Sequence, residues 1–112
     1  MTAQSDTQES VGTRSEAAAS TLRPRLWRVL LHNDDYTTQD FVVWVLETVF
    51  RKAHAEAVDI MTSVHRTGNG LAGVFTHDVA DTRVRRAQAL AELHEFPLLV
   101  TMEPEPEHGG EA

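Results

Sequence analysis

The placement of large apolar side chains limits what this chain can fold into. Nearly all of them lie between Leu26 and Met102, and the flanking segments consist mainly of Ser, Thr, Ala, Gln, Glu, Pro and Gly. A segment that cannot bury apolar surface cannot offset the entropy that ordering removes. The sequence therefore predicts one small folded domain at residues 25–104. We expect residues 1–24 to form a disordered N-terminal arm and residues 105–112 to form an acidic, flexible tail.

Charge and composition exclude several classes of protein. The 112 residues carry a formal net charge of −7 and include no cysteine, which excludes disulfides, thiolate zinc sites and a cysteine nucleophile. Binding to a phosphate backbone would need clustered Lys and Arg. The N-terminus lacks the basic and apolar regions of a secretory signal, and no apolar run is long enough to span a bilayer. We expect a soluble, cytoplasmic protein that binds neither nucleic acid nor membrane and needs no cofactor or metal.

Hydrophobic periodicity predicts the first two elements of the domain. From Leu26 to His32 the residues Trp27, Val29 and Leu31 alternate with Arg28, Leu30 and His32, which indicates a strand, and Asn33-Asp34-Asp35-Tyr36 is typical of a turn. A helix is expected to begin near Thr37 as its N-cap, with Asp40 in the capping-box position. Its core-facing stripe comprises Phe41, Val42, Val45, Leu46, Val49 and Phe50.

The remaining elements follow from the same patterns. A second helix is predicted from His54 to His65, and Gly68 is placed to end this segment. Leu71–Phe75 is expected to form a short strand, Thr76 to cap a third helix, and Leu98–Met102 to form the last strand. The order β-α-α-β-α-β predicts an α+β fold in which helices pack on a small sheet.

Polar residues at the predicted element ends suggest a ligand site. Asn33, Asp34 and Asp35 follow the first strand, and His65 ends the second helix with Met61 on the same face. An α-ammonium group has three N–H donors, so three converging acceptors satisfy it and a carboxylate balances its charge. An apolar wall beside them would suit a bulky side chain such as Leu, Phe, Tyr or Trp. That wall could come from Leu31, Thr37, Val42, Met61, Val64 and Leu98.

Four segments together resemble the ClpS family, the adaptors of the ATP-dependent Clp protease. They are HNDDYTTQDFVVWVLETVF, MTSVH, GVFTHDVADTRV and FPLLVT, and the resemblance in order and spacing covers Leu26 to Glu103. It implies a three-stranded antiparallel sheet with three helices, similar to the C-terminal domain of the ribosomal stalk protein. It also implies a non-catalytic, monomeric adaptor of the N-end rule. Such an adaptor recognises a free N-terminal bulky hydrophobic residue and delivers the protein to the N-domain of a ClpA- or ClpC-type ATPase.

The resemblance also implies roles for individual residues. The substrate α-amino group would be held by Asn33, Asp34, Asp35 and His65. The pocket for the N-terminal side chain would comprise Leu31, Thr37, Gln39, Val42, Met61, Val64 and Leu98. Asp78 and Arg83 would dock the ATPase, and the N-terminal arm would take part in delivery. Gln39 stands where the family often has a methionine that gates the pocket against β-branched residues.

The same residues are compatible with functions of other classes. Asp34 or Asp35 with His65 could form an acid–base pair, but the sequence has no nucleophile elbow, phosphate loop or HExxH motif. His32 with the same three residues could bind a metal. A stalk-like docking domain could share the fold without the pocket. The two aspartates could also simply favour a helix N-terminus, and Trp44 could be a partner contact or a partly covered surface aromatic.

Overall fold

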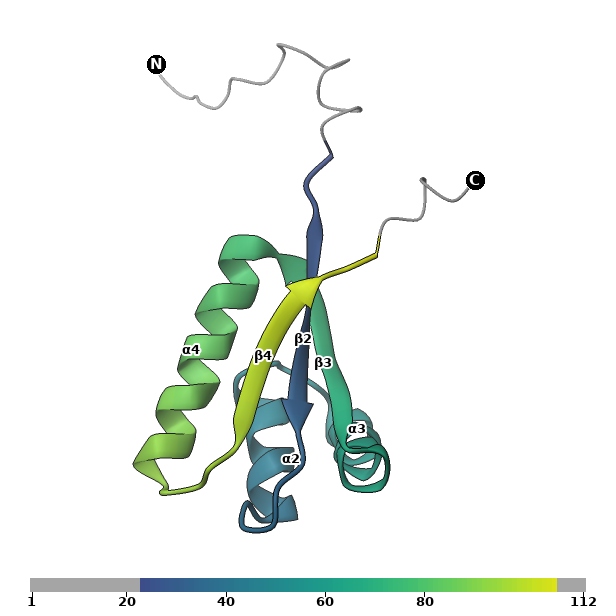
Figure 1. Ribbon diagram of the computed structural model, residues 1–112. Helices are drawn as coiled ribbons and strands as arrows, with labels where there is room; N and C mark the ends of the chain where they lie inside the picture. The colour runs from purple at the N-terminus through teal and green to yellow at the C-terminus, as the bar shows by residue number, and fades with distance from the viewer. Residues whose placement is uncertain (1–22, 107–112) are drawn as a thin grey trace.

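The computed structural model describes residues 23–106. The predicted arm and tail therefore lie almost wholly outside the described residues. Within the described part, Figure 1 shows a sheet and helices in the predicted order β-α-α-β-α-β. The elements are β2 (Leu26–His32), α2 (Gln39–Thr48), α3 (His54–Thr67), β3 (Asn69–Thr76), α4 (His77–Leu93) and β4 (Leu99–Pro104).

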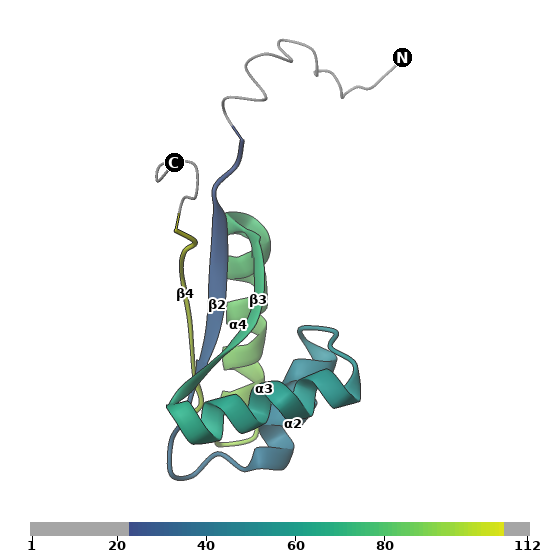
Figure 2. The ribbon, with the colours of Figure 1, turned by 90° about the vertical axis from the view of Figure 1, so that its right-hand side faces the viewer.

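The described residues form a three-stranded antiparallel sheet with β2 at its centre, in the order β3-β2-β4. Val29 of β2 pairs with Gly73 on one side and Met102 on the other. The helices lie on one face of this sheet, as the side view in Figure 2 shows. Since side chains alternate along a strand, one face of each strand packs against the helices and the other faces outward.

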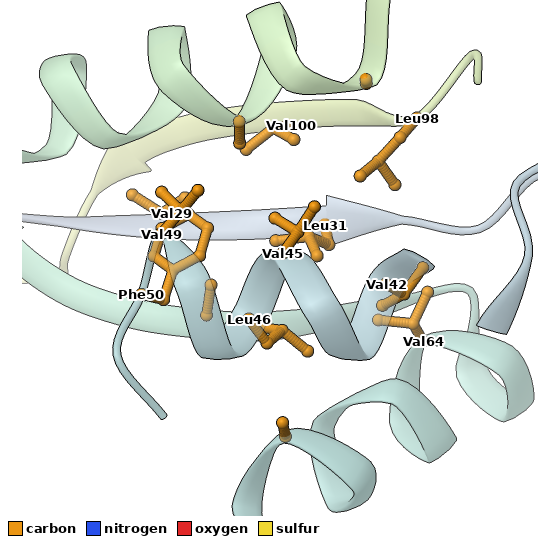
Figure 3. Packing of buried hydrophobic residues seen from close by; sticks show 14 of the residues in the cluster. Val29, Leu31, Val42, Val45, Leu46, Val49, Phe50, Val64, Leu98 and Val100 are labelled. Carbon is orange, nitrogen blue, oxygen red and sulfur yellow. The ribbon is translucent and has the colours of Figure 1, made fainter. Parts of the chain in front are cut away.

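The hydrophobic core lies between the sheet and the helices. All six residues of the predicted stripe are buried there: four lie on α2, and Val49 and Phe50 follow its last residue. Figure 3 shows Val45, Leu46 and Val49 of this stripe among side chains from the strands. The periodicity of the sequence therefore identified the buried face of α2 correctly.

The prediction that Thr37 caps α2 is wrong. Thr38 is the N-cap, and its hydroxyl accepts a hydrogen bond from the backbone amide of Phe41 at 3.1 Å. The hydroxyl of Thr37 instead points to the carboxylate of Asp34, to which it donates. The end of α3 is as predicted, with Gly68 in the left-handed region at φ 100°. Element ends elsewhere differ from the prediction by one or two residues, within the usual uncertainty of helix and strand boundaries.

A side chain of α4 holds the last strand in place. The Gln88 amide nitrogen donates to the carbonyl of Leu98 at 3.2 Å, and its amide oxygen accepts from the backbone N–H of Val100 at 2.7 Å. Gln88 therefore occupies backbone groups that an outer strand would otherwise use, which fixes β4 against α4.

Candidate binding site at the end of the central strand

A cavity of about 260 Å³ opens where β2, α2 and α3 meet. This volume lies just below the range typical of pockets for drug-sized ligands, so it suits a single side chain. Its lining residues come from the loop after β2, the first turns of α2 and the second half of α3. They are Asn33, Asp34, Asp35, Thr37, Gln39, Val42, Met61, Val64 and His65.

A backbone hydrogen bond joins two sides of the cavity. The amide of Asn33, just after β2, donates to the carbonyl of Gly68, just after α3, at 2.9 Å. Helix α3 can lie this close because residue 70 is glycine. A Cβ there would sit 2.7 Å from Cγ2 of Val64, a distance that no real contact tolerates. The close approach of α3 to the sheet brings His65 beside the loop that carries Asn33 and the two aspartates.

The carboxylate of Asp34 accepts three hydrogen bonds within its own loop. Oδ1 accepts from the backbone amides of Tyr36 at 2.8 Å and Thr37 at 2.7 Å, and Oδ2 accepts from the Thr37 hydroxyl at 2.7 Å. Partial burial alone would raise the pKa of Asp34, but these hydrogen bonds stabilise the charged form, and the pKa falls below its usual value of 3.8. Asp34 is therefore an ionised group that shapes the loop.

Four other polar side chains of the lining have no partner within residues 23–106. Those of Asn33, Asp35, Gln39 and His65 are exposed and make no hydrogen bond or ion pair with another residue of the described chain. They supply amide oxygens, a carboxylate and an imidazole nitrogen, and His65 lies in the last turn of α3, where the helix dipole is negative. This arrangement favours a cationic ligand with several N–H donors.

The apolar part of the lining is narrower than the sequence suggested. Val42 and Val64 are buried and Met61 is half-buried, and all three line the cavity. Leu31 and Leu98, at 0% and 2% exposed, do not line it. They belong to the core cluster that also includes the two valines (Figure 3).

His32 lies apart from the cavity. Its Nε2 hydrogen-bonds with the hydroxyl of Thr101 on β4 at 2.8 Å, and it does not line the cavity. Residues 23–106 contain no group of three or more His, Cys, Asp or Glu side chains placed to hold a metal ion. None of the helices in this range is long and apolar enough to cross a membrane.

Comparison with protein families identifies the chain. The family described as "ATP-dependent Clp protease adaptor protein ClpS" matches residues 22–101. The chain belongs to the ClpS family. This confirms the resemblance seen in the four sequence segments and places the chain among the adaptors of the Clp protease.

ClpS proteins of known sequence and structure are similar to most of the chain. The ClpS adapter of Myxococcus xanthus is 49% identical over 96 residues, 86% of this chain and 90% of that protein. The ClpS adapter of Deinococcus radiodurans is 53% identical over 95 residues, 85% of this chain and 84% of that protein. The structure of Agrobacterium tumefaciens ClpS2 bound to L-phenylalaninamide matches with a TM-score of 0.72 and 41% identity, covering 74% of this chain and all of that one.

The two residues predicted to dock the ATPase differ in their surroundings in this ClpS chain. Asp78 lies in the first turn of α4 and is fully exposed, 3.5 Å from Nδ1 of His77. Arg83 is half-buried: its Nη1 donates to the carbonyl of Val49 at 3.0 Å, and its Cζ lies 5.2 Å from the centre of the Phe75 ring. Arg83 thus ties α4 to the end of α2, a structural role that no local sequence pattern indicates.

Trp44 of this ClpS chain lies in an aromatic cluster that is open on one side. Its ring centre is 5.7 Å from that of Phe41 and 5.4 Å from that of His94, and 39% of the residue is exposed. Phe41 also contacts Phe96 at 4.7 Å between ring centres. The cluster packs α2 against the segment that follows α4, so Trp44 is a partly covered surface aromatic in the described chain.

Proposed function

We propose that this member of the ClpS family captures peptides and proteins by a free, bulky hydrophobic N-terminal residue (Leu, Phe, Tyr or Trp). One observation best supports this proposal. Beside the apolar wall of a small cavity lie three polar side chains that have no partner within the described chain, those of Asn33, Asp35 and His65. An α-ammonium group supplies the positive charge and the N–H donors that such acceptors need, and the first side chain fills the cavity. The phenylalaninamide bound by the Agrobacterium protein has both features.

The two aspartates have different proposed roles. The carboxylate of Asp34 accepts hydrogen bonds from Tyr36 and Thr37, so we assign it the role of holding the loop in its conformation. Asp35 has no partner among the described residues, so it provides the counter-charge for the ammonium group. The same distribution disfavours an acid–base pair between Asp34 and His65, because the Asp34 carboxylate is already committed to donors within the loop. The proposed adaptor performs no chemistry on its ligand.

Capture is tested by fluorescence anisotropy with a labelled peptide that begins with Phe. The same peptide with an acetylated N-terminus, and a version that begins with Glu, are the controls. The free Phe peptide alone should bind. Equal binding of all three peptides, or of none, would contradict the proposal and favour a docking domain without a pocket.

Variants of the acceptors make the test specific to the site. Replacing Asn33, Asp35 or His65 with Ala should each cost roughly 1 to 3 kcal/mol of binding free energy, because a buried ammonium donor loses its partner. Asp59→Asn is the matched control, since Asp59 is an exposed acidic residue of α3 that does not line the cavity. Unchanged affinity in all three Ala variants would remove these residues from amine binding.

Delivery to a Clp ATPase is the second part of the proposal. Membership of an adaptor family supports it, and Asp78 is accessible for docking on the N-domain of a ClpA- or ClpC-type ATPase. Titration of that isolated N-domain by calorimetry should give a 1:1 complex with monomeric adaptor in the presence of the Phe peptide. Absence of heat with both types of N-domain would contradict delivery while leaving peptide capture intact. We propose that this delivery to the ATPase takes place in the cytoplasm.

A further inference from the structure

Gln39 is a polar residue on the wall of the cavity that α2 provides. The proposed amine acceptors come from the ends of β2 and α3, which the Asn33–Gly68 hydrogen bond joins. Gln39 comes from α2, as the first residue of that helix, and Val42 follows three positions later on the same helical face. If the amine of a ligand is held at the β2–α3 junction, the first side chain that enters the cavity lies among its lining residues, and Gln39 is one of these.

The amide of Gln39 is available to a ligand. It is exposed and makes no hydrogen bond with another described residue, so water satisfies it in the free protein. A side chain that fills the cavity displaces that water. Phe and Leu offer the amide nothing in return, whereas the hydroxyl of Tyr and the indole N–H of Trp can donate to its oxygen.

We propose that the amide of Gln39 favours N-terminal Tyr and Trp over Phe and Leu. This inference rests on the proposed function, because it assumes that the first side chain enters this cavity. One net hydrogen bond corresponds to a preference of roughly three- to tenfold. The preference for Tyr and Trp should not exceed that range, because the exposed amide of Gln39 can hydrogen-bond with water when Phe or Leu is bound.

The test compares matched pairs of peptides that differ at one atom or group. One pair begins with Tyr or Phe. The other begins with Trp or with β-(3-benzothienyl)alanine, in which sulfur replaces the indole N–H. Dissociation constants are measured by anisotropy for the full chain and for Gln39→Met, which keeps the length of the side chain but removes its amide. Asp40→Asn is the control, since Asp40 is the exposed neighbour of Gln39 and does not line the cavity.

The expected result is a three- to tenfold preference within each pair for the unaltered chain and for Asp40→Asn. Gln39→Met should bind both members of each pair equally, with an unchanged melting temperature. Equal affinities in the unaltered chain, or a preference that survives in Gln39→Met, would overturn the role of Gln39 while leaving N-terminal capture in place. Failure of every free peptide to bind would instead overturn the proposed function, and the present inference with it.

Discussion

Thr37 donates to both carboxylate oxygens of Asp34, through its backbone amide at 2.7 Å and its hydroxyl at 2.7 Å. These bonds close the loop between β2 and α2 and leave the hydroxyl of Thr38 to cap the helix. Because the carboxylate is used within the loop, the neighbouring pair of aspartates divides into a structural residue and one without a partner among the described residues.

The two aspartates should therefore respond differently to removal of their charge. Asp34→Asn replaces charge-assisted hydrogen bonds by weaker ones and leaves one donor of the loop poorly matched, so it should lower the free energy of unfolding by about 1 to 2 kcal/mol. Asp35→Asn should leave stability unchanged and weaken binding of the Phe peptide. Urea unfolding and anisotropy of both variants separate these effects. Equal loss of stability in the two variants would contradict the division of roles.

The lowered pKa of Asp34 makes stability depend on pH in a definite direction. A carboxyl group whose pKa is lower in the folded than in the unfolded state stabilises the fold above its unfolded pKa, and this contribution is lost as pH falls through the folded value. The contribution of Asp34 should thus be complete above about pH 5 and decline below about pH 4. Urea unfolding of the unaltered chain and Asp34→Asn from pH 6 to pH 3 measures it. The gap in stability between them should narrow on acidification, and a constant gap would contradict this linkage.

The fold could be predicted from the sequence because its signals are local. The apolar stripe of α2 and the strand Leu26–His32 depend on neighbours a few residues apart, and both appear as predicted. The N-cap of α2 could not be predicted in the same way. Thr37 and Thr38 are equally suitable residue types, and the choice depends on a hydrogen bond from Thr37 to Asp34 that forms only in the folded loop.

The polar part of the cavity lining could be predicted from the sequence, but the extent of its apolar part could not. The order of elements brings the loop after β2 to the end of α3, so the polar residues of the lining gather as expected. Leu31 and Leu98 are apolar, and the sequence cannot distinguish a side chain that faces a cavity from one buried behind it. Arg83 and Val49 are 34 residues apart, so no local pattern could reveal the bond between them.

The contacts of Arg83 predict that its replacement lowers the stability of the fold, whatever its effect on docking. Arg83→Met keeps an apolar stem over Phe75 but leaves the Val49 carbonyl without its donor, which should lower the free energy of unfolding by about 1 to 2 kcal/mol. Asp78→Asn is the matched change on the same helix, and it should lower the melting temperature less, because the Asp78 side chain is fully exposed and makes no contact with α2. Thermal unfolding followed by circular dichroism compares the two. An unchanged melting temperature in Arg83→Met would show that the bond to Val49 is not formed in solution.

His65 should contribute to peptide binding as a hydrogen-bond acceptor. A neutral imidazole has one nitrogen that can accept from the ligand amine, and the amide oxygen of glutamine can accept in its place. His65→Gln should therefore keep more affinity for the Phe peptide than His65→Ala, which has no acceptor. His54→Gln, which replaces an exposed histidine of α3 outside the lining, should bind the peptide as the unaltered chain does. Equal affinities of His65→Gln and His65→Ala would exclude His65 as an acceptor of the substrate amine.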